Sequence, residues 1–412
     1  MNAEAQPPSQ RPTKEQSTAE SYFVTADDDR EPVISVVMPT LNEEGGIEEC
    51  IEWTKSAFES VELPGEIVLS DSSTDRTPEI GREMGARVVE PDEGGYGYAY
   101  RYAFERARGE YIVMGDADTT YDFEELPKLL EPVRAGEADI CMGSRFEGEI
   151  KDGAMPKLHQ YFGNPLLTTF LNIFYHADVS DAHSGFRVFR RDVLDRLDLS
   201  ADGMEFASEM VMESASRDLK IVEVPITYHE REGEATLNSF QDGWRHVKFM
   251  LVNAPGYLFS IPGAVLFGIG VALMGFALIG ATFPSVRLSP VWQQGVNFGV
   301  RSAILGSLLA IVGYHVGSLG IFATVASDPI HRPDDVVTNA IVEHLSLERG
   351  AMVGLVLFGV GLGYAVVLIG RWLTSGYVAL PPLTHDVIAF TLIVLGIQTV
   401  FGSFFMSTVA EG

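Results

Sequence analysis

Two aspartates separated by one residue are the part of this sequence best suited to chemistry. Asp116 and Asp118 directly follow residues 111–114, an apolar segment typical of a strand. Carboxylates placed where a strand opens into a loop can both reach one hard divalent cation. Mg²⁺ and Mn²⁺ take one or two protein carboxylates together with phosphate oxygens and water, and such an ion neutralises the charge of a leaving pyrophosphate. Most isolated pairs of this kind are solvated loop residues, but the preceding strand favours a metal site with Mg²⁺ or Mn²⁺ as cofactor.

The same residues allow a second interpretation. Asp116, Asp118 and Thr120 fit the D-x-D-x-T motif of haloacid-dehalogenase-like phosphatases, in which the first Asp is a nucleophile. That motif normally ends the first strand of its domain, whereas two or three strand-like segments precede Asp116 here. The phosphatase is therefore the weaker of the two interpretations.

The aspartates require a fold that brings strand ends together. Strand-like and helix-like segments alternate before and after them, a pattern that favours right-handed crossovers and a mainly parallel α/β sheet. Ligands bind at the carboxyl ends of the strands in such sheets. The predicted strands are residues 33–38, 66–69, 87–89, 111–114 and the edge strand 223–226. The predicted helices cover about 43–60, a segment from 77, and a segment that follows the loop 94–97 and ends near 108.

The chain is strongly acidic, with 57 Asp and Glu against 29 Lys and Arg, and only seven of the basic residues are lysines. The net charge of −28 excludes non-specific nucleic-acid binding, which needs clustered basic residues. Acidity with little lysine is typical of a salt-loving organism, and an ordinary acidic protein kept soluble by its charge is the alternative. Cys50 and Cys141 are too few and too far apart for a disulfide framework or a zinc site, which favours a reducing compartment.

Composition divides the 412 residues into a soluble part and a membrane part. Residues 1–30 contain no apolar stretch and are predicted to be a disordered tail. Residues 31–237 are predicted to form the catalytic domain, 238–257 an interfacial juxtamembrane helix, and 258–412 a transmembrane domain. Four apolar segments are each long enough to cross a bilayer, namely 259–281, 302–326, 351–373 and 387–409.

Two shorter segments are suited to the membrane surface. Residues 165–175 are apolar but too short to span, which predicts an interfacial or buried helix. Residues 242–249 combine Trp244 with Arg245 and Lys248, a mixture typical of a membrane-surface helix. The basic residues around the four spans show little bias between the two sides. We expect the catalytic domain to be cytoplasmic, and the charge pattern contributes little to this expectation.

The motifs together resemble family 2 glycosyltransferases of the GT-A fold, most closely the polyprenyl-phosphate sugar synthases such as dolichol-phosphate mannose synthase, over residues 33–250. Residues 39–43 match the family's first-strand turn, and residues 70–75 match its D-D-G-S-T-D turn. Ser70 and Ser72 replace the family's Asp and Gly, so the base could be guanine or uracil. The resemblance implies that the nucleotide-sugar is bound by Pro39, Thr40, Asn42, Glu43, Asp71 and Asp116.

The resemblance extends to the acceptor side. Residues 143–145 match the family's G-S-R, whose arginine faces the donor and acceptor phosphates with a fixed fork of donors. Ala and Thr stand at 235–236 in place of the family's Ser-Lys, which leaves Arg231 as the stronger phosphate ligand there. A solvated helix face is the alternative for Arg187 and for the arginines at 190–191. The implied catalytic residues are Asp116, Asp118 and Arg145, and the implied acceptor or phosphate-binding residues are Arg145, Asn164, Asp181, Ser184, Arg187 and Arg231.

The reaction implied by this resemblance is the inverting, metal-dependent transfer of a hexose from a nucleotide-sugar to dolichyl or polyprenyl phosphate. The product would be a lipid-phosphate-linked sugar for glycosylation, for example of protein asparagines. A sugar hydroxyl needs a general base, whereas a phosphate monoester, with a second pKa of about 6, is largely dianionic near neutrality. The lack of an obvious catalytic His or Glu is therefore compatible with this acceptor, and the acidic composition favours an archaeal dolichol.

Other functions are weighed against this one. Processive polysaccharide synthases carry Q-x-x-R-W before their spans, and residues 241–245 contain these residue types in the wrong order. Another membrane acceptor, or a flippase-like or scaffolding protein that only binds the nucleotide-sugar, is also possible. The G-x-x-x-G motifs at 313–317 and 359–363 permit close helix packing and self-association. His315 in the second span is functional or, more commonly for such a residue, a packing histidine.

Overall fold

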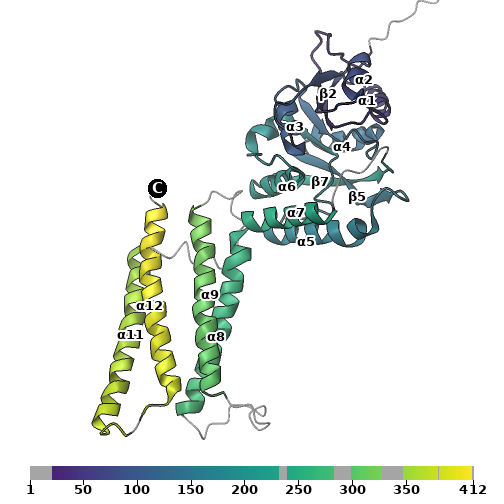
Figure 1. Ribbon diagram of the computed structural model, residues 1–412. Coiled ribbons are helices and arrows are strands. Elements are labelled where there is room, and N and C mark those ends of the chain that lie inside the picture. Colours follow the sequence, from purple (N-terminus) through teal and green to yellow (C-terminus); the bar gives the residue numbers. More distant parts are fainter. Residues whose placement is uncertain (1–20, 232–238, 283–297, 327–346, 379, 411–412) are drawn as a thin grey trace, which may run out of the picture.

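The computed structural model of the protein describes residues 21–231, 239–282, 298–326, 347–378 and 380–410. An α/β domain lies beside a group of long helices (Figure 1). Among the described strands, only β6 runs against its neighbours, so the sheet is mainly parallel. The sheet order is β3 (Arg87–Val89), β2 (Gly65–Asp71), β1 (Ile34–Thr40), β4 (Tyr111–Met114), β6 (Arg187–Arg190), β5 (Ile140–Ile150) and β7 (Ile221–Tyr228).

The sheet separates two hydrophobic cores because helices cover both of its faces. The central strands β1 and β2 are almost wholly buried, as expected of parallel strands covered on both sides. One core contains α3 (Tyr96–Phe104), α5 (Asn164–Tyr175) and α6 (Phe206–Ser216). The other contains α1 (Ile47–Val61) and α4 (Leu126–Arg134), and α2 (Thr77–Glu83) packs at its margin. The predicted Rossmann-like GT-A architecture, with β7 at its edge, is confirmed.

The first helix begins later than predicted. It starts at Ile47 rather than at residue 43, because the residues before it are engaged by the loop that follows β2. The Glu43 N–H donates to Thr77 Oγ1 (2.9 Å) and the Glu44 N–H donates to Asp75 Oδ2 (3.2 Å). These bonds hold residues 43–46 as a turn at the carboxyl end of the sheet.

Within the described residues, four helical segments are long and apolar enough to cross a membrane. Each predicted span overlaps one of these segments, and two spans end one or two residues beyond theirs, which confirms the four-helix part of the predicted fold. The first two helices pack closely at glycines, since an added Cβ on Gly313 would lie 2.3 Å from the backbone nitrogen of Phe267. His315 is exposed on the second helix, so it does not pack against the described residues of this chain. The helices are α8 (Ile261–Thr282), α9 (Val300–Ala326), α11 (Leu347–Thr374) and α12 (Leu383–Ala410).

A helix at the junction joins the two parts. Helix α7 (Ser239–Asn253) runs beside α5 on the side of the α/β domain nearest the long helices (Figure 1). After Asn253 the chain passes through the π-helical turn η4 (Gly256–Ser260) directly into α8. The Tyr175 hydroxyl donates to the Asn253 carbonyl (2.9 Å) and so ties α5 to the end of α7. The domain boundaries drawn from the sequence stay a prediction.

Candidate active site

Two loops at the carboxyl ends of β1 and β2 hold each other in place. Thr40 Oγ1 donates to Asp71 Oδ1 (2.7 Å), and the Asn42 N–H donates to Ser73 Oγ (2.8 Å). In return the Thr74 N–H donates to Asn42 Oδ1 (2.8 Å). Asn42 has a positive φ of 60°, a conformation that Asn tolerates better than most residues. The structure thus brings together Thr40, Asn42 and Asp71, and the register places Pro39 beside Ser70 on the same strands.

Asp116, the first aspartate of the D-x-D motif, lies beyond β4 and accepts hydrogen bonds from two tyrosine hydroxyls. Tyr96 Oη and Tyr100 Oη both donate to Asp116 Oδ1, at 2.8 and 3.2 Å. Burial raises the pKa of Asp116 to about 6 and the charge of Asp118 adds to the rise, while the two phenols oppose it. Sequence reasoning missed both tyrosines. Their i, i+4 spacing at the start of a helix places them on one face, but nothing local indicates which group they meet.

Asp118, the second aspartate, faces the guanidinium group of Arg231. Asp118 Oδ1 accepts from Thr120 Oγ1 (2.5 Å), and Asp118 Oδ2 lies 3.6 Å from Arg231 Nη1. The same guanidinium donates through Nη2 to Glu43 Oε1 (2.5 Å). Burial raises the pKa of Glu43 to about 7 despite the opposing charge of Arg231. Arg231 therefore links the predicted nucleotide-binding loop to the metal motif.

The donor set at the two aspartates fits a divalent cation that also binds a ligand. The phenols occupy Oδ1 of Asp116, and its Oδ2 is directed towards Gly185, where an added Cβ would lie 3.1 Å away. In the part of the chain that the structure describes, no group of three or more His, Cys, Asp or Glu side chains could hold a metal. Two carboxylates alone match Mg²⁺ or Mn²⁺ sites in which phosphate oxygens and water complete the coordination.

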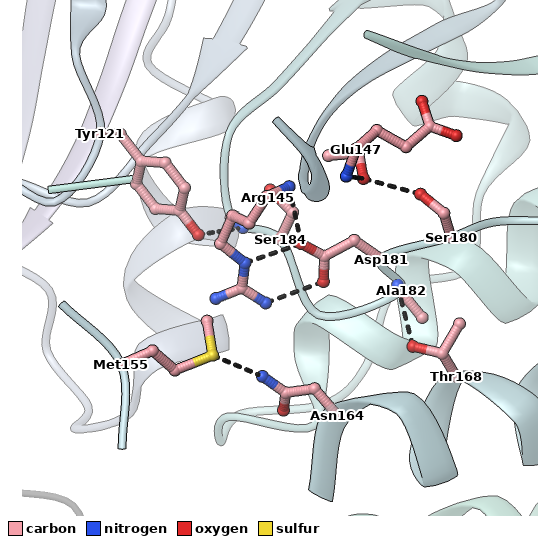
Figure 2. Close-up of polar contacts among 12 residues, drawn as sticks. Tyr121, Arg145, Glu147, Met155, Asn164, Thr168, Ser180, Asp181, Ala182 and Ser184 are labelled. Carbon is pink, nitrogen blue, oxygen red and sulfur yellow. Dashed lines mark hydrogen bonds and ion pairs between the residues drawn. The ribbon is translucent and has the colours of Figure 1, made fainter. Parts of the chain in front are cut away.

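A buried ion pair forms the other side of the site (Figure 2). Arg145 donates to Asp181 through Nε (2.7 Å), Nη2 (2.8 Å) and its backbone N–H (3.0 Å). Burial favours the neutral form of Asp181, but the charge of Arg145 and these hydrogen bonds hold the pKa of Asp181 below its usual value. Arg145 stands where the pairing of β5 with β7 shifts in register between Ser144 and Glu149. Such an irregularity redirects a side chain out of the regular strand pattern.

The backbone of Asp181 is fixed as firmly as its side chain. Glu223, on the edge strand β7, accepts from the backbone N–H groups of Ser180 (2.5 Å) and Asp181 (2.9 Å). Sequence reasoning missed this role of Glu223. The residue lies 42 positions from Asp181 along the chain, so only the sheet topology reveals the contact.

The remaining predicted acceptor residues have different surroundings. Asn164 begins α5 and donates to Met155 Sδ (3.6 Å), and Ser184 Oγ is buried with no hydrogen-bond partner in the structure. Arg187 is completely buried on β6, so the predicted helix face is wrong for this residue. Its guanidinium donates to the carbonyls of Ser184, Ala182 and Ala207 at 2.9, 3.1 and 2.9 Å. These bonds fasten the loop before β6 to α6 and do not favour phosphate binding by Arg187.

Comparison with known proteins identifies the family. Residues 35–198 match the sequence model described as glycosyl transferase family 2, and residues 321–410 match the family 2 C-terminal transmembrane region. The low-salt glycan biosynthesis hexosyltransferase Agl6 of Haloferax volcanii is 56% identical over 394 residues, which cover 96% of this chain and 93% of that protein. The chain belongs to glycosyltransferase family 2.

Two further proteins to which this family 2 glycosyltransferase is similar are a second transferase of Haloferax volcanii and a solved mycobacterial synthase. The dolichyl-phosphate hexose transferase of Haloferax volcanii is 36% identical over 212 residues, covering 51% of this chain and 89% of that protein. A crystal structure of glucosyl-3-phosphoglycerate synthase from Mycobacterium tuberculosis with Mn²⁺, UDP and glucosyl-3-phosphoglycerate covers 54% of this chain and 79% of its own, with 25% identity and a TM-score of 0.44. Membership of family 2, together with the position of Asp116 after the fourth strand of the chain, rejects the phosphatase interpretation.

Proposed function

We propose that this family 2 enzyme transfers a hexose from a GDP- or UDP-linked sugar to a polyisoprenyl phosphate such as dolichyl phosphate, with inversion at the anomeric carbon. One observation carries the proposal. Gly185 belongs to the same loop as Asp181, which anchors Arg145, and an added Cβ on Gly185 would lie 3.1 Å from Asp116 Oδ2. The loop that anchors Arg145 therefore lies against the metal motif, which supports transfer between two phosphate-bearing molecules.

The donor side follows from the loops at the strand ends. Thr40, Asn42 and Asp71 offer hydroxyl, amide and carboxylate groups to the base and ribose, and Pro39 and Glu43 belong to the same turn. Mg²⁺ or Mn²⁺ held by the aspartate pair would neutralise the departing nucleoside diphosphate. Arg231, which already faces this pair, suits the same developing charge.

The acceptor side needs charge stabilisation and positioning rather than a base. The dianionic lipid phosphate attacks directly, so binding that aligns it with the anomeric carbon supplies most of the catalysis. The ion pair with Asp181 uses Nε and Nη2 of Arg145, so the third guanidinium nitrogen, Nη1, points away from Asp181 (Figure 2). Asn164 and Ser184, which Figure 2 draws together with Arg145, complete the proposed phosphate site.

The surface of the α/β domain supports a membrane-embedded acceptor. Leu166 and Ile173 of α5 and Trp244 and Val252 of α7 are exposed apolar side chains on the two helices nearest the long apolar helices (Figure 1). Exposed apolar residues gathered on adjacent helices mark an interaction surface, and here α7 leads directly into a membrane helix. We place the catalytic domain on the cytoplasmic face, where nucleotide-sugars occur. Self-association through the glycines of α11 stays a prediction.

The test is transfer of radiolabelled sugar from GDP-mannose, UDP-glucose and related donors to dolichyl phosphate by the full-length protein in high salt with Mg²⁺ or Mn²⁺. We expect label in an organic-extractable, acid-labile lipid, lost with chelator and in Asp118→Ala. Asp152→Ala, which removes an exposed aspartate, is the matched control and should leave transfer unchanged. Retained binding of a donor without any lipid product would instead favour another acceptor or a binding role.

A further inference from the structure

Hydrogen bonds attach the loop at residues 179–186 to helix α5. The Asn172 side chain donates to the Val179 carbonyl (2.8 Å) and accepts from the Val179 N–H (3.1 Å). The Ala182 N–H donates to Thr168 Oγ1 of the same helix (3.4 Å). Because this loop carries Asp181, its position sets that of Arg145 as well. The loop is thus held by α5, a helix with an exposed apolar face.

A chain of three polar side chains connects the loop to α6 and α7. His183 Nε2 lies 3.1 Å from Ser208 Oγ on α6, and the same Oγ lies 3.3 Å from His246 Nδ1 on α7. The two imidazole rings meet edge to face with centroids 5.0 Å apart. Ser208 is completely buried and His246 nearly so. We call these three residues the Ser208 bridge.

The single hydroxyl proton of Ser208 limits the donor and acceptor roles within the bridge. A hydroxyl has one proton, so Ser208 can donate to one imidazole while it accepts from the other. The imidazole that accepts from Ser208 must be neutral. Burial lowers the pKa of His183 to about 3, which keeps that ring neutral. Each contact is close to the upper limit for a hydrogen bond. A small shift of α7 would therefore break the contact of Ser208 with His246.

We propose that the Ser208 bridge is a positioning device that couples the seating of α7 at the membrane surface to the acceptor-binding pair Arg145 and Asp181. This inference rests on the proposed function. Since His183 is two residues from Asp181, a seated α7 fixes the loop through the Ser208 bridge, and α5 fixes it through Thr168 and Asn172. The catalytic arginine then has its working geometry when both helices lie against the membrane that holds the lipid acceptor. The bridge acts through Asp181 and does not touch the sugar.

The experiment compares two buried serines of one helix in the full-length protein, reconstituted in lipid nanodiscs containing dolichyl phosphate. Ser208→Ala breaks the bridge, whereas Ser214→Ala removes a hydroxyl that bonds only to the Met210 carbonyl of its own helix (2.5 Å). We expect Ser208→Ala to raise the KM for dolichyl phosphate about 5-fold, the ratio that corresponds to one neutral hydrogen bond. The KM for the nucleotide-sugar and the unfolding temperature should stay close to those of Ser214→Ala. Ser208→Thr, which restores a hydroxyl, should recover most of the acceptor KM.

A second variant separates coupling from general damage. His246→Phe keeps an aromatic ring and removes the hydrogen bond, so it should raise the acceptor KM as Ser208→Ala does. The double variant should be no worse than Ser208→Ala alone, because that substitution already breaks the contact with His246. Equal effects of Ser208→Ala and Ser214→Ala, an equal rise of the donor KM, or additive effects in the double variant would each overturn the coupling. Absence of lipid product from the unaltered protein would overturn the proposed function, and the bridge's role with it.

Discussion

Substitution of Gly185 by alanine tests whether the acceptor loop and the metal motif share one space. The added Cβ would lie 3.1 Å from Asp116 Oδ2 and 3.3 Å from both Tyr96 Oη and Tyr121 Cε2. The neighbours must therefore move by a few tenths of an ångström. Gly185 is not among the described glycines with positive φ, so alanine adds no backbone strain.

The size of the effect follows from this displacement. A misplacement of about 1 Å can cost about 100-fold in rate, so a few tenths of an ångström predicts a loss of kcat on the order of 10-fold. The crowding should cost about 1–3 kcal/mol of folding stability, as overpacking in protein interiors does. Transfer kcat and the Mn²⁺ dependence of the rate, measured beside the unfolding temperature, separate the two effects. Gly45→Ala is the matched control, because nothing lies within 4 Å of its added Cβ. A kcat of Gly185→Ala within 2-fold of the control would refute the view that Asp116 Oδ2 serves the reaction from this direction.

Three further predictions concern the same site. Tyr96→Phe removes a donor to Asp116 and should lower kcat/KM about 10-fold, a typical value for a hydrogen bond to a charged group; Tyr98→Phe, whose hydroxyl bonds elsewhere, should leave kcat/KM unchanged in the same assay. Arg145→Lys keeps the charge but loses the bidentate fork, so the acceptor KM should rise at least about 10-fold while the donor KM is retained; an unchanged acceptor KM would contradict the assigned role. Burial lowers the pKa of His183 to about 3 from an ordinary value of 6.5, so the unfolded chain binds a proton that the folded one does not, and the stability present above pH 6.5 is lost as the pH falls towards 3. His183→Asn should weaken this acid dependence in unfolding temperatures measured from pH 7 to 4, and an identical pH profile would count against it.

The central strands and the membrane helices could be predicted because each is a local run of mainly apolar residues. Strands such as β1 and β4 are short apolar runs covered on both faces, and the long helices are apolar on all sides. The start of α1 could not be placed, since the turn at 43–46 is held by Thr77 and Asp75, some 30 residues away in the chain. Local propensity is silent about such tertiary bonds.

The positions of site residues could be predicted where a local motif follows a strand. They could not be predicted where a side chain bonds to residues far away in the chain. Asp116 and Asp118 follow a strand, so their position at the sheet edge can be inferred from the sequence alone. Arg187 gave the wrong impression, because arginines near a polar stretch suggest a solvated surface. Its actual partners are three backbone carbonyls, one of them 20 residues away on α6. An arginine that serves the backbone in this way has no sequence signature.

The direct passage from α7 through η4 into α8 leaves no slack between the catalytic domain and the bilayer. A domain attached in this way would meet a lipid substrate by diffusion within the plane of the bilayer. Under the proposed function, the relevant substrate variable is then the mole fraction of dolichyl phosphate in the membrane, not its amount per volume of buffer. Diluting proteoliposomes should leave the turnover of each enzyme unchanged, whereas diluting the acceptor with other lipids should slow it.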